Sequence, residues 1–379
     1  MDVKFAYWVP NVSGGLVVSN LPQRTDWTFE YNQWLAQTAE EVGFDYALSQ
    51  ARFFASYGAE FQIEALTLTA ALAAVTKKIT LISALHPGLW HPGVIAKSIA
   101  SLDQISQRRA AVNIVSGWFK GEFTGYGEPW LDHDERYRRS EEFIRVLKGM
   151  WTEEEFTFKG DFYRINGAPL KPKPVRKPHP PIFQGGNSKA ARQMAARVSD
   201  WYFMNGNSVE KVSEQIEEIR ALAKENGRDP NEISFGLNAF VISRPTEEEA
   251  RATLRDIIAH ADREAVEGFA SQVKHAGQAS PEKQGMWAES GFEDLVQYND
   301  GFKTGLIGTP EQIAARIAVY EAVGVDLILC GFLHFTDDLP AFGQDVIPLV
   351  RDLPSQKATD GKVPSVDSAA RERELVTAG

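Results

Sequence analysis

The chain has 379 residues but only one cysteine, and it has no long apolar run and no excess of positive charge. Because Cys330 has no second cysteine to pair with, an internal disulfide is excluded, and a reducing cytoplasmic location is expected. Because the sequence has no apolar run of about 18 residues, we expect no membrane span. Because its N-terminus has no basic segment followed by an apolar one, we expect no signal peptide. The net charge of −11 argues against nucleic acid or an anionic membrane as a partner.

Several motifs of well-known cofactor, metal and hydrolase sites are missing as well. No G-x-G-x-x-G follows the first expected strand, which argues against a dinucleotide-binding fold, and there is no Walker loop. The sequence has neither an H-E-x-x-H nor a paired-cysteine pattern, nor a G-x-S-x-G elbow. His86 and His91 lie in a loop with Pro87 and Pro92, a poor arrangement for metal ligands. We therefore expect no metal site.

What the chain does have is a regular alternation of short apolar strands with amphipathic helices. The eight expected strands begin near residues 3, 45, 79, 110, 182, 201, 233 and 326. Eight such units in about 350 residues favour a (β/α)₈ TIM barrel, an α/β fold, over an open doubly wound sheet.

Two stretches interrupt this alternation and are expected to be insertions in the barrel. The first, near residues 151–181, holds a hairpin-like run and a proline-rich linker. The second, near residues 262–303, is long, polar and a candidate lid. We expect one barrel domain over residues 1–353 and a flexible C-terminal tail over residues 354–379.

The segment from Pro181 to Ala191 predicts an anion site. It indicates a short strand, a tight turn at Gly185 and Gly186, and a helix capped by Asn187 or Ser188. Unpaired backbone N–H groups at the positive end of a helix favour an anion, most often phosphate. An ordinary strand-to-helix turn without a ligand is the alternative for this motif taken alone.

Polar and aromatic residues collect where the expected strands end, which is where the active sites of TIM barrels lie. Each of them also has a simpler structural interpretation, such as Asn113 bonding only to backbone or His334 only capping a strand. The residues at these ends that we single out are Asn11, Ala51, Arg52, His86, Asn113, Trp118, Glu122 and His334.

Three segments resemble the bacterial-luciferase-like flavin monooxygenases, namely residues 113–118, 131–137 and 183–188. Further similarity lies in residues 306–310 and 324–334, and the resemblance covers roughly residues 1–352. The pattern is most similar to the branch that contains alkanesulfonate, pyrimidine and dimethylsulfone monooxygenases.

This resemblance implies a (β/α)₈ barrel that binds reduced FMN (FMNH2), delivered by a separate NAD(P)H-dependent flavin reductase, with O2 as co-substrate. It also implies a cis peptide bond at Ser83–Ala84 beneath the flavin ring, and a homodimer or homotetramer. The residues that it implies for flavin binding are Ala51, Arg52, Ser83, Ala84, Asn113, Glu122, Arg136, Tyr137, Gly185, Gly186 and Ser188.

The positions at which this sequence differs from the alkanesulfonate enzymes indicate which substrate it binds. Their arginine and histidine on strand seven are matched by Asn238 and Phe240, and their tyrosine near strand eight by Phe332. Because burying an anion without a partner costs several kcal/mol, this pattern favours a small neutral substrate. Arg52 would supply the missing cation if it pointed into the pocket.

Together these features predict a two-component, FMNH2-dependent monooxygenase that cleaves the C–S bond of dimethylsulfone to methanesulfinate and formaldehyde. The alternatives are an alkanesulfonate or methanesulfonate monooxygenase, a flavin-binding protein without oxygenase activity, and a deazaflavin-dependent dehydrogenase on the same fold. The expected substrate contacts are Asn11, His86, Trp118, Phe240, Phe332 and His334.

Overall fold

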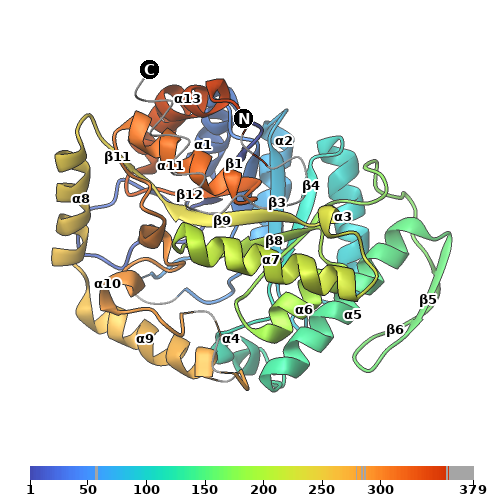
Figure 1. Cartoon of the computed structure of the whole chain (residues 1–379). Coiled ribbons are helices and arrows are strands. Elements are labelled where there is room, and N and C mark those ends of the chain that lie inside the picture. Colours follow the sequence, from blue (N-terminus) through green and yellow to red (C-terminus); the bar gives the residue numbers. More distant parts are fainter. Residues whose placement is uncertain (56–58, 279, 283–284, 286, 356, 358–379) are drawn as a thin grey trace.

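A closed barrel of eight parallel strands forms the centre of the computed structural model (Figure 1). The structure describes residues 1–55, 59–278, 280–282, 285, 287–355 and 357. Each strand pairs with the next in the series, and the last pairs with the first, so the expected (β/α)₈ barrel is confirmed. In barrel order the strands are β1 (Lys4–Val9), β2 (Tyr46–Ser49), β3 (Thr80–Leu85), β4 (Ala110–Ile114), β7 (Ile182–Gly185), β8 (Trp201–Met204), β9 (Ser234–Phe240) and β12 (Leu327–Gly331).

Helices connect these strands and cover the outside of the barrel (Figure 1). Their ends follow local capping chemistry: α11 begins with a capping box between Thr309 and Gln312, and α1 ends at Gly43, whose φ is 102°. The helices of this layer are α1 (Phe29–Val42), α2 (Ala65–Val75), α3 (Pro92–Ser106), α4 (Lys120–Gly125), α5 (His133–Thr152), α6 (Lys189–Val198), α7 (Val209–Glu225), α11 (Pro310–Ala322), α12 (Phe335–Ala341), η3 (Phe342–Val346) and α13 (Ile347–Asp352).

The barrel is filled by side chains, which leaves space for a ligand only at its ends. Ala6, Leu48 and Ile82 are among the residues of its buried inner cluster. In the same cluster, Phe183 stacks on Trp201 and on Phe203, with ring centroids 5.1 Å apart in each pair. A larger apolar cluster packs between the strands and the helices.

The two insertions leave the barrel at different places. The first contains an antiparallel hairpin of β5 (Glu155–Lys159) and β6 (Arg164–Pro169), as the sequence indicated. The second is more helical than its polar sequence suggested, because α9 buries Val266, Phe269 and Val273. Its elements are α9 (Arg263–Gln278), α10 (Phe292–Leu295) and η2 (Gly301–Thr304). A lid role for it stays a prediction.

Some elements outside the barrel strands were not revealed by the sequence. They are η1 (Pro230–Glu232), α8 (Glu247–Ala259) and a small parallel sheet of β10 (Ile242–Ser243) and β11 (Ile307–Gly308). Within the described part of the chain, no helix is both long and apolar enough to cross a membrane. Most of the predicted tail, from residue 358 on, lies outside the described residues.

Candidate functional site

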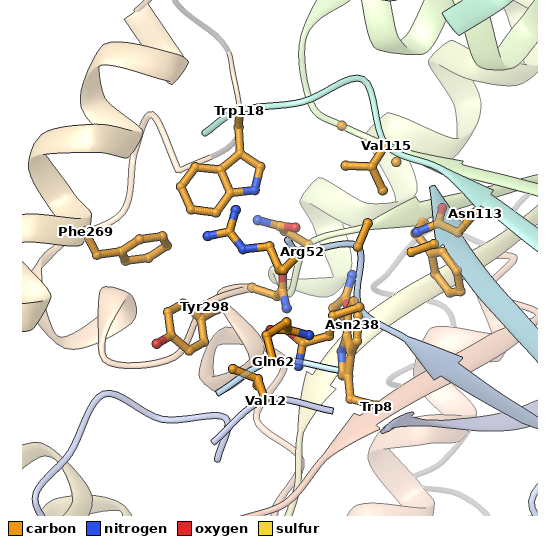
Figure 2. A pocket seen from close by; sticks show the side chains of 18 of the residues that line it. Trp8, Val12, Arg52, Gln62, Asn113, Val115, Trp118, Asn238, Phe269 and Tyr298 are labelled. Atoms are coloured by element: carbon orange, nitrogen blue, oxygen red, sulfur yellow. The ribbon is translucent and has the colours of Figure 1, made fainter. Parts of the chain in front are cut away.

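A cavity with about 1120 Å³ of empty space, part of it open to solvent, lies at the carboxyl ends of the strands. Figure 2 shows side chains of the barrel, such as Asn113 and Asn238, facing Phe269 and Tyr298 of the second insertion across it. Its lining is mainly aromatic rings and carboxamides. The aromatic residues are Trp8, Trp118, Phe203, Phe269, Trp287 and Tyr298, and the amides are Gln50, Gln62, Asn113, Asn205, Asn238 and Asn299.

The structure brings some of the predicted site residues to this cavity and leaves others behind its wall. Those that line it are Ala51, Arg52, Ala84, Asn113, Trp118, Gly185 and Gly186. Those that do not are Asn11, Ser83, His86, Glu122, Arg136, Tyr137, Ser188, Phe240, Phe332 and His334.

Gly185 and Gly186 of the turn after β7 line the cavity, and the turn packs closely against Tyr137 and Ala191. Gly186 has a φ of +136°, and a Cβ there would lie 2.7 Å from the Tyr137 hydroxyl and 2.8 Å from the Ala191 Cβ. Ser188 caps α6 by accepting from the Ala191 N–H at 3.3 Å. Burial raises the pKa of Tyr137, so its hydroxyl is a neutral donor at physiological pH. A phosphate group fits this cradle of small residues and neutral donors.

Arg136, which the resemblance implied for flavin binding, stacks on an aromatic ring. Its guanidinium carbon is 4.0 Å from the centre of the Trp130 ring, and its Nη1 donates to the Leu131 carbonyl at 3.4 Å. The side chain is almost fully buried, and its Nε has no hydrogen-bond partner. A contact between Arg136 and phosphate therefore stays a prediction.

Glu122 holds the segment that follows β2. Its Oε1 accepts from the backbone N–H of Phe53 at 2.9 Å and of Phe54 at 3.2 Å. Its Oε2 lies 3.4 Å from Nη1 of Arg52 and 3.6 Å from Nε2 of His86. Glu122 is fully buried behind the cavity wall, so it positions Arg52 rather than facing the cavity itself.

His86 and Asn11, expected as substrate contacts, also serve backbone groups. The ring nitrogens of His86 lie 2.9 Å from the Val115 carbonyl and 3.1 Å from the Ala51 carbonyl. Burial lowers the pKa of His86, although the Glu122 carboxylate opposes this shift. Asn11 donates to the Ile63 carbonyl at 2.9 Å and also bonds the backbone of Gln50. Both residues support segments that line the cavity.

The remaining expected contacts pack away from the cavity. Phe240 contacts Phe302 edge-on at 5.1 Å. Phe332 faces the C-terminal helices, where its ring lies 5.5 Å from that of Phe335. His334 precedes α12 and accepts from the backbone N–H of Arg24 at 3.2 Å. Of the six expected substrate contacts, Trp118 alone lines the cavity in the described structure.

The expected cis peptide bond at Ser83–Ala84 is wrong. The cis bonds in the described part of the chain are Lys171–Pro172 and Lys177–Pro178. Strand β3 instead continues its parallel pairing with β4 through Ser83↔Val112, Ala84↔Asn113 and Leu85↔Ile114, which keeps its backbone regular.

Sequence reasoning missed a hydrogen-bonded pair on the cavity wall. The Nε1 of Trp8 donates to Oδ1 of Asn238 at 3.1 Å, and Nδ2 of Asn238 donates to the Met204 carbonyl at 2.8 Å. Trp8 stands near the end of β1, a position that could have marked it. Among the described residues there is no cluster of His, Cys, Asp and Glu that could hold a metal ion.

The closed barrel has an aromatic and amide-lined cavity at its strand ends, the place where active sites of TIM-barrel enzymes lie. The profile of the luciferase-like monooxygenases matches residues 3–327. The chain therefore belongs to the luciferase-like monooxygenase family.

Two relatives are similar over nearly the whole chain. An FMNH(2)-dependent dimethylsulfone monooxygenase of Pseudomonas putida is 63% identical over 355 residues, covering 94% of this chain and 97% of that protein. A second FMNH(2)-dependent dimethylsulfone monooxygenase, from Pseudomonas fluorescens (strain Pf0-1), is 61% identical over 351 residues, which cover 93% of this chain and 95% of that protein. The crystal structure of a riboflavin lyase with modified FMN and riboflavin has a TM-score of 0.81 at 21% identity and covers 99% of this chain and 96% of that one. This likeness supports the fold alone.

Proposed function

We propose that the chain is an FMNH2-dependent, two-component monooxygenase that cleaves the C–S bond of dimethylsulfone. Both relatives that are more than 60% identical carry this activity in their names. In the balanced reaction, dimethylsulfone, FMNH2 and O2 give methanesulfinate, formaldehyde, FMN and water. The reaction needs a flavin reductase as partner, and the substrate is small and carries no charge.

The cavity lining is the observation that carries the choice of a neutral substrate. Carboxamides, including Asn238 and Gln62, provide neutral donors and acceptors, and aromatic rings provide apolar walls. The charge of Arg52, the one Lys or Arg among the described lining residues, is balanced by Glu122. A sulfone requires hydrogen bonds to its oxygens and no counter-ion, which such a lining can supply.

FMN fits the residues at the strand ends. Oδ1 of Asn113 is buried and has no hydrogen-bond partner, and Asn113 lines the cavity, so it can accept from the flavin ring. Gly185, Gly186, Ser188 and Tyr137 would hold the phosphate. When bound, reduced FMN supplies the electrons for O2 activation. The protein orients the substrate and excludes water with the aromatic rings of Trp118, Phe269 and Trp287.

Assembly and location complete the proposal. We expect a homodimer or homotetramer, which light scattering of the purified protein would establish. A cytoplasmic location and the boundaries of the single domain stay predictions.

Formaldehyde release tests the proposal. The purified protein is incubated with dimethylsulfone, FMN, NADH and a flavin reductase, and matched reactions omit either dimethylsulfone or the protein. We expect formaldehyde and methanesulfinate in equal amounts in the complete reaction alone. Flavin oxidation that dimethylsulfone leaves unchanged, with no formaldehyde, would contradict the proposed activity.

A further inference from the structure

We infer that Glu122 determines the charge specificity of the cavity: its buried carboxylate neutralises Arg52, so that the cavity accepts a neutral sulfone and rejects a sulfonate anion. The inference rests on the proposed function and deepens it. In this account Glu122 is a positioning and specificity residue that acts through Arg52, and it contacts neither flavin nor substrate.

Arg52 is placed where a substrate can meet it. Its guanidinium carbon lies 4.5 Å from the centre of the Trp118 ring and 4.9 Å from that of Phe119, so the planar group is held by aromatic faces. Figure 2 shows the guanidinium inside the cavity, beside the indole of Trp118. Since the rings fix the guanidinium, its position does not depend on Glu122 alone.

The Glu122 side chain is fixed by its hydrogen-bond partners. Both of its oxygens face donors: Oε1 accepts two backbone N–H groups, and Oε2 faces the Arg52 guanidinium. Burial lowers the pKa of the neighbouring His86, and the Glu122 carboxylate opposes this shift. The negative charge of Glu122 therefore offsets the positive charge of Arg52.

This balance separates the two kinds of ligand. A sulfonate that approaches Arg52 is attracted by the guanidinium. It is also repelled by the Glu122 carboxylate, which lies 3.4 Å from Nη1 of Arg52 and is fully buried, so that water screens its charge little. A sulfone has no net charge to be repelled and can accept from the guanidinium N–H groups. The same balance favours the departure of methanesulfinate, since that product is an anion.

The test removes the carboxylate charge and keeps its shape. In Glu122→Gln the amide oxygen can still accept from Phe53 and Phe54, while the cluster gains one net positive charge. We expect calorimetry to find methanesulfonate binding at least about tenfold tighter than in the wild type. Glu122→Asp keeps the negative charge and should bind methanesulfonate as weakly as the wild type does. The double variant Arg52→Gln, Glu122→Gln removes both charges and should lose the gain in methanesulfonate affinity.

Glu142 provides a matched control. It also anchors a loop through backbone N–H groups, those of Asp161, Phe162 and Tyr163, but it lies on α5 beside the hairpin and away from the cavity lining. Glu142→Gln should leave methanesulfonate binding unchanged. If Glu122→Gln does not fold, Gln62→Lys adds a positive charge to the cavity wall and should give the same gain.

Unchanged methanesulfonate binding in a folded Glu122→Gln, or a gain that survives in the double variant, would overturn the inference. Because calorimetry requires no turnover, these outcomes are distinct from failure of the proposed function, which would appear as absence of formaldehyde from dimethylsulfone in the wild type.

Discussion

Replacing Gly186 by alanine should weaken FMN binding by about 10- to 100-fold. Its φ of +136° is a backbone conformation that residues with a Cβ rarely adopt, and the new Cβ would lie 2.7 Å from the Tyr137 hydroxyl and 2.8 Å from the Ala191 Cβ. Strain of this kind costs about 1–3 kcal/mol, and about 1.4 kcal/mol corresponds to tenfold in affinity. The turn can relieve the strain only by moving the groups that would hold the phosphate. Anaerobic fluorescence titration with reduced FMN measures the effect.

Gly227→Ala is the matched control for this change. Gly227 also has a positive φ, +72°, but a Cβ there meets nothing within 4 Å. This variant should lose some stability and bind reduced FMN as the wild type does. A dissociation constant for Gly186→Ala within about twofold of the wild type would refute the assignment of the phosphate to this turn.

Three further changes separate cavity residues from supporting ones. Asn238→Ala leaves the indole N–H of Trp8 without its partner and should lower kcat/KM for dimethylsulfone about tenfold, measured by formaldehyde release, with FMN affinity unchanged. Tyr137→Phe should raise the FMN dissociation constant about fivefold in the same titration, and equally at pH 7 and pH 8, because burial raises the pKa of this phenol above its usual value. Phe332→Leu should lower the free energy of unfolding by about 1 kcal/mol, measured by thermal unfolding, and leave kcat/KM unchanged, since the ring packs on Phe335.

The fold could be predicted because its signals are local. Helix α6 runs from Lys189 to Val198, as the sequence indicated, since Ser188 caps it and the apolar positions repeat with helical spacing. The end of the chain was less readable. The helical region there begins at Phe335 and continues through Pro340, a residue that disfavours a helix interior, because the surrounding aromatic packing outweighs local preference.

The candidate site could be predicted only in part, because position on a strand does not give the direction of a side chain. Gly185 and Gly186 were found since their motif is contiguous in sequence. His86 and Phe332 also follow strands, yet they point into the supporting layer. The cavity wall formed by Phe269 could not be foreseen, because it depends on how the second insertion packs against the barrel.

The most direct test of the account compares dimethylsulfone with methanesulfonate at equal concentration, with the same FMN, NADH and flavin reductase. The neutral, amide-lined cavity and the balanced pair of Arg52 and Glu122 predict strong discrimination. A desolvation penalty of about 3 kcal/mol for the sulfonate corresponds to about 100-fold. We therefore predict formaldehyde from dimethylsulfone and little or none from methanesulfonate. Equal rates from the two substrates would contradict the account.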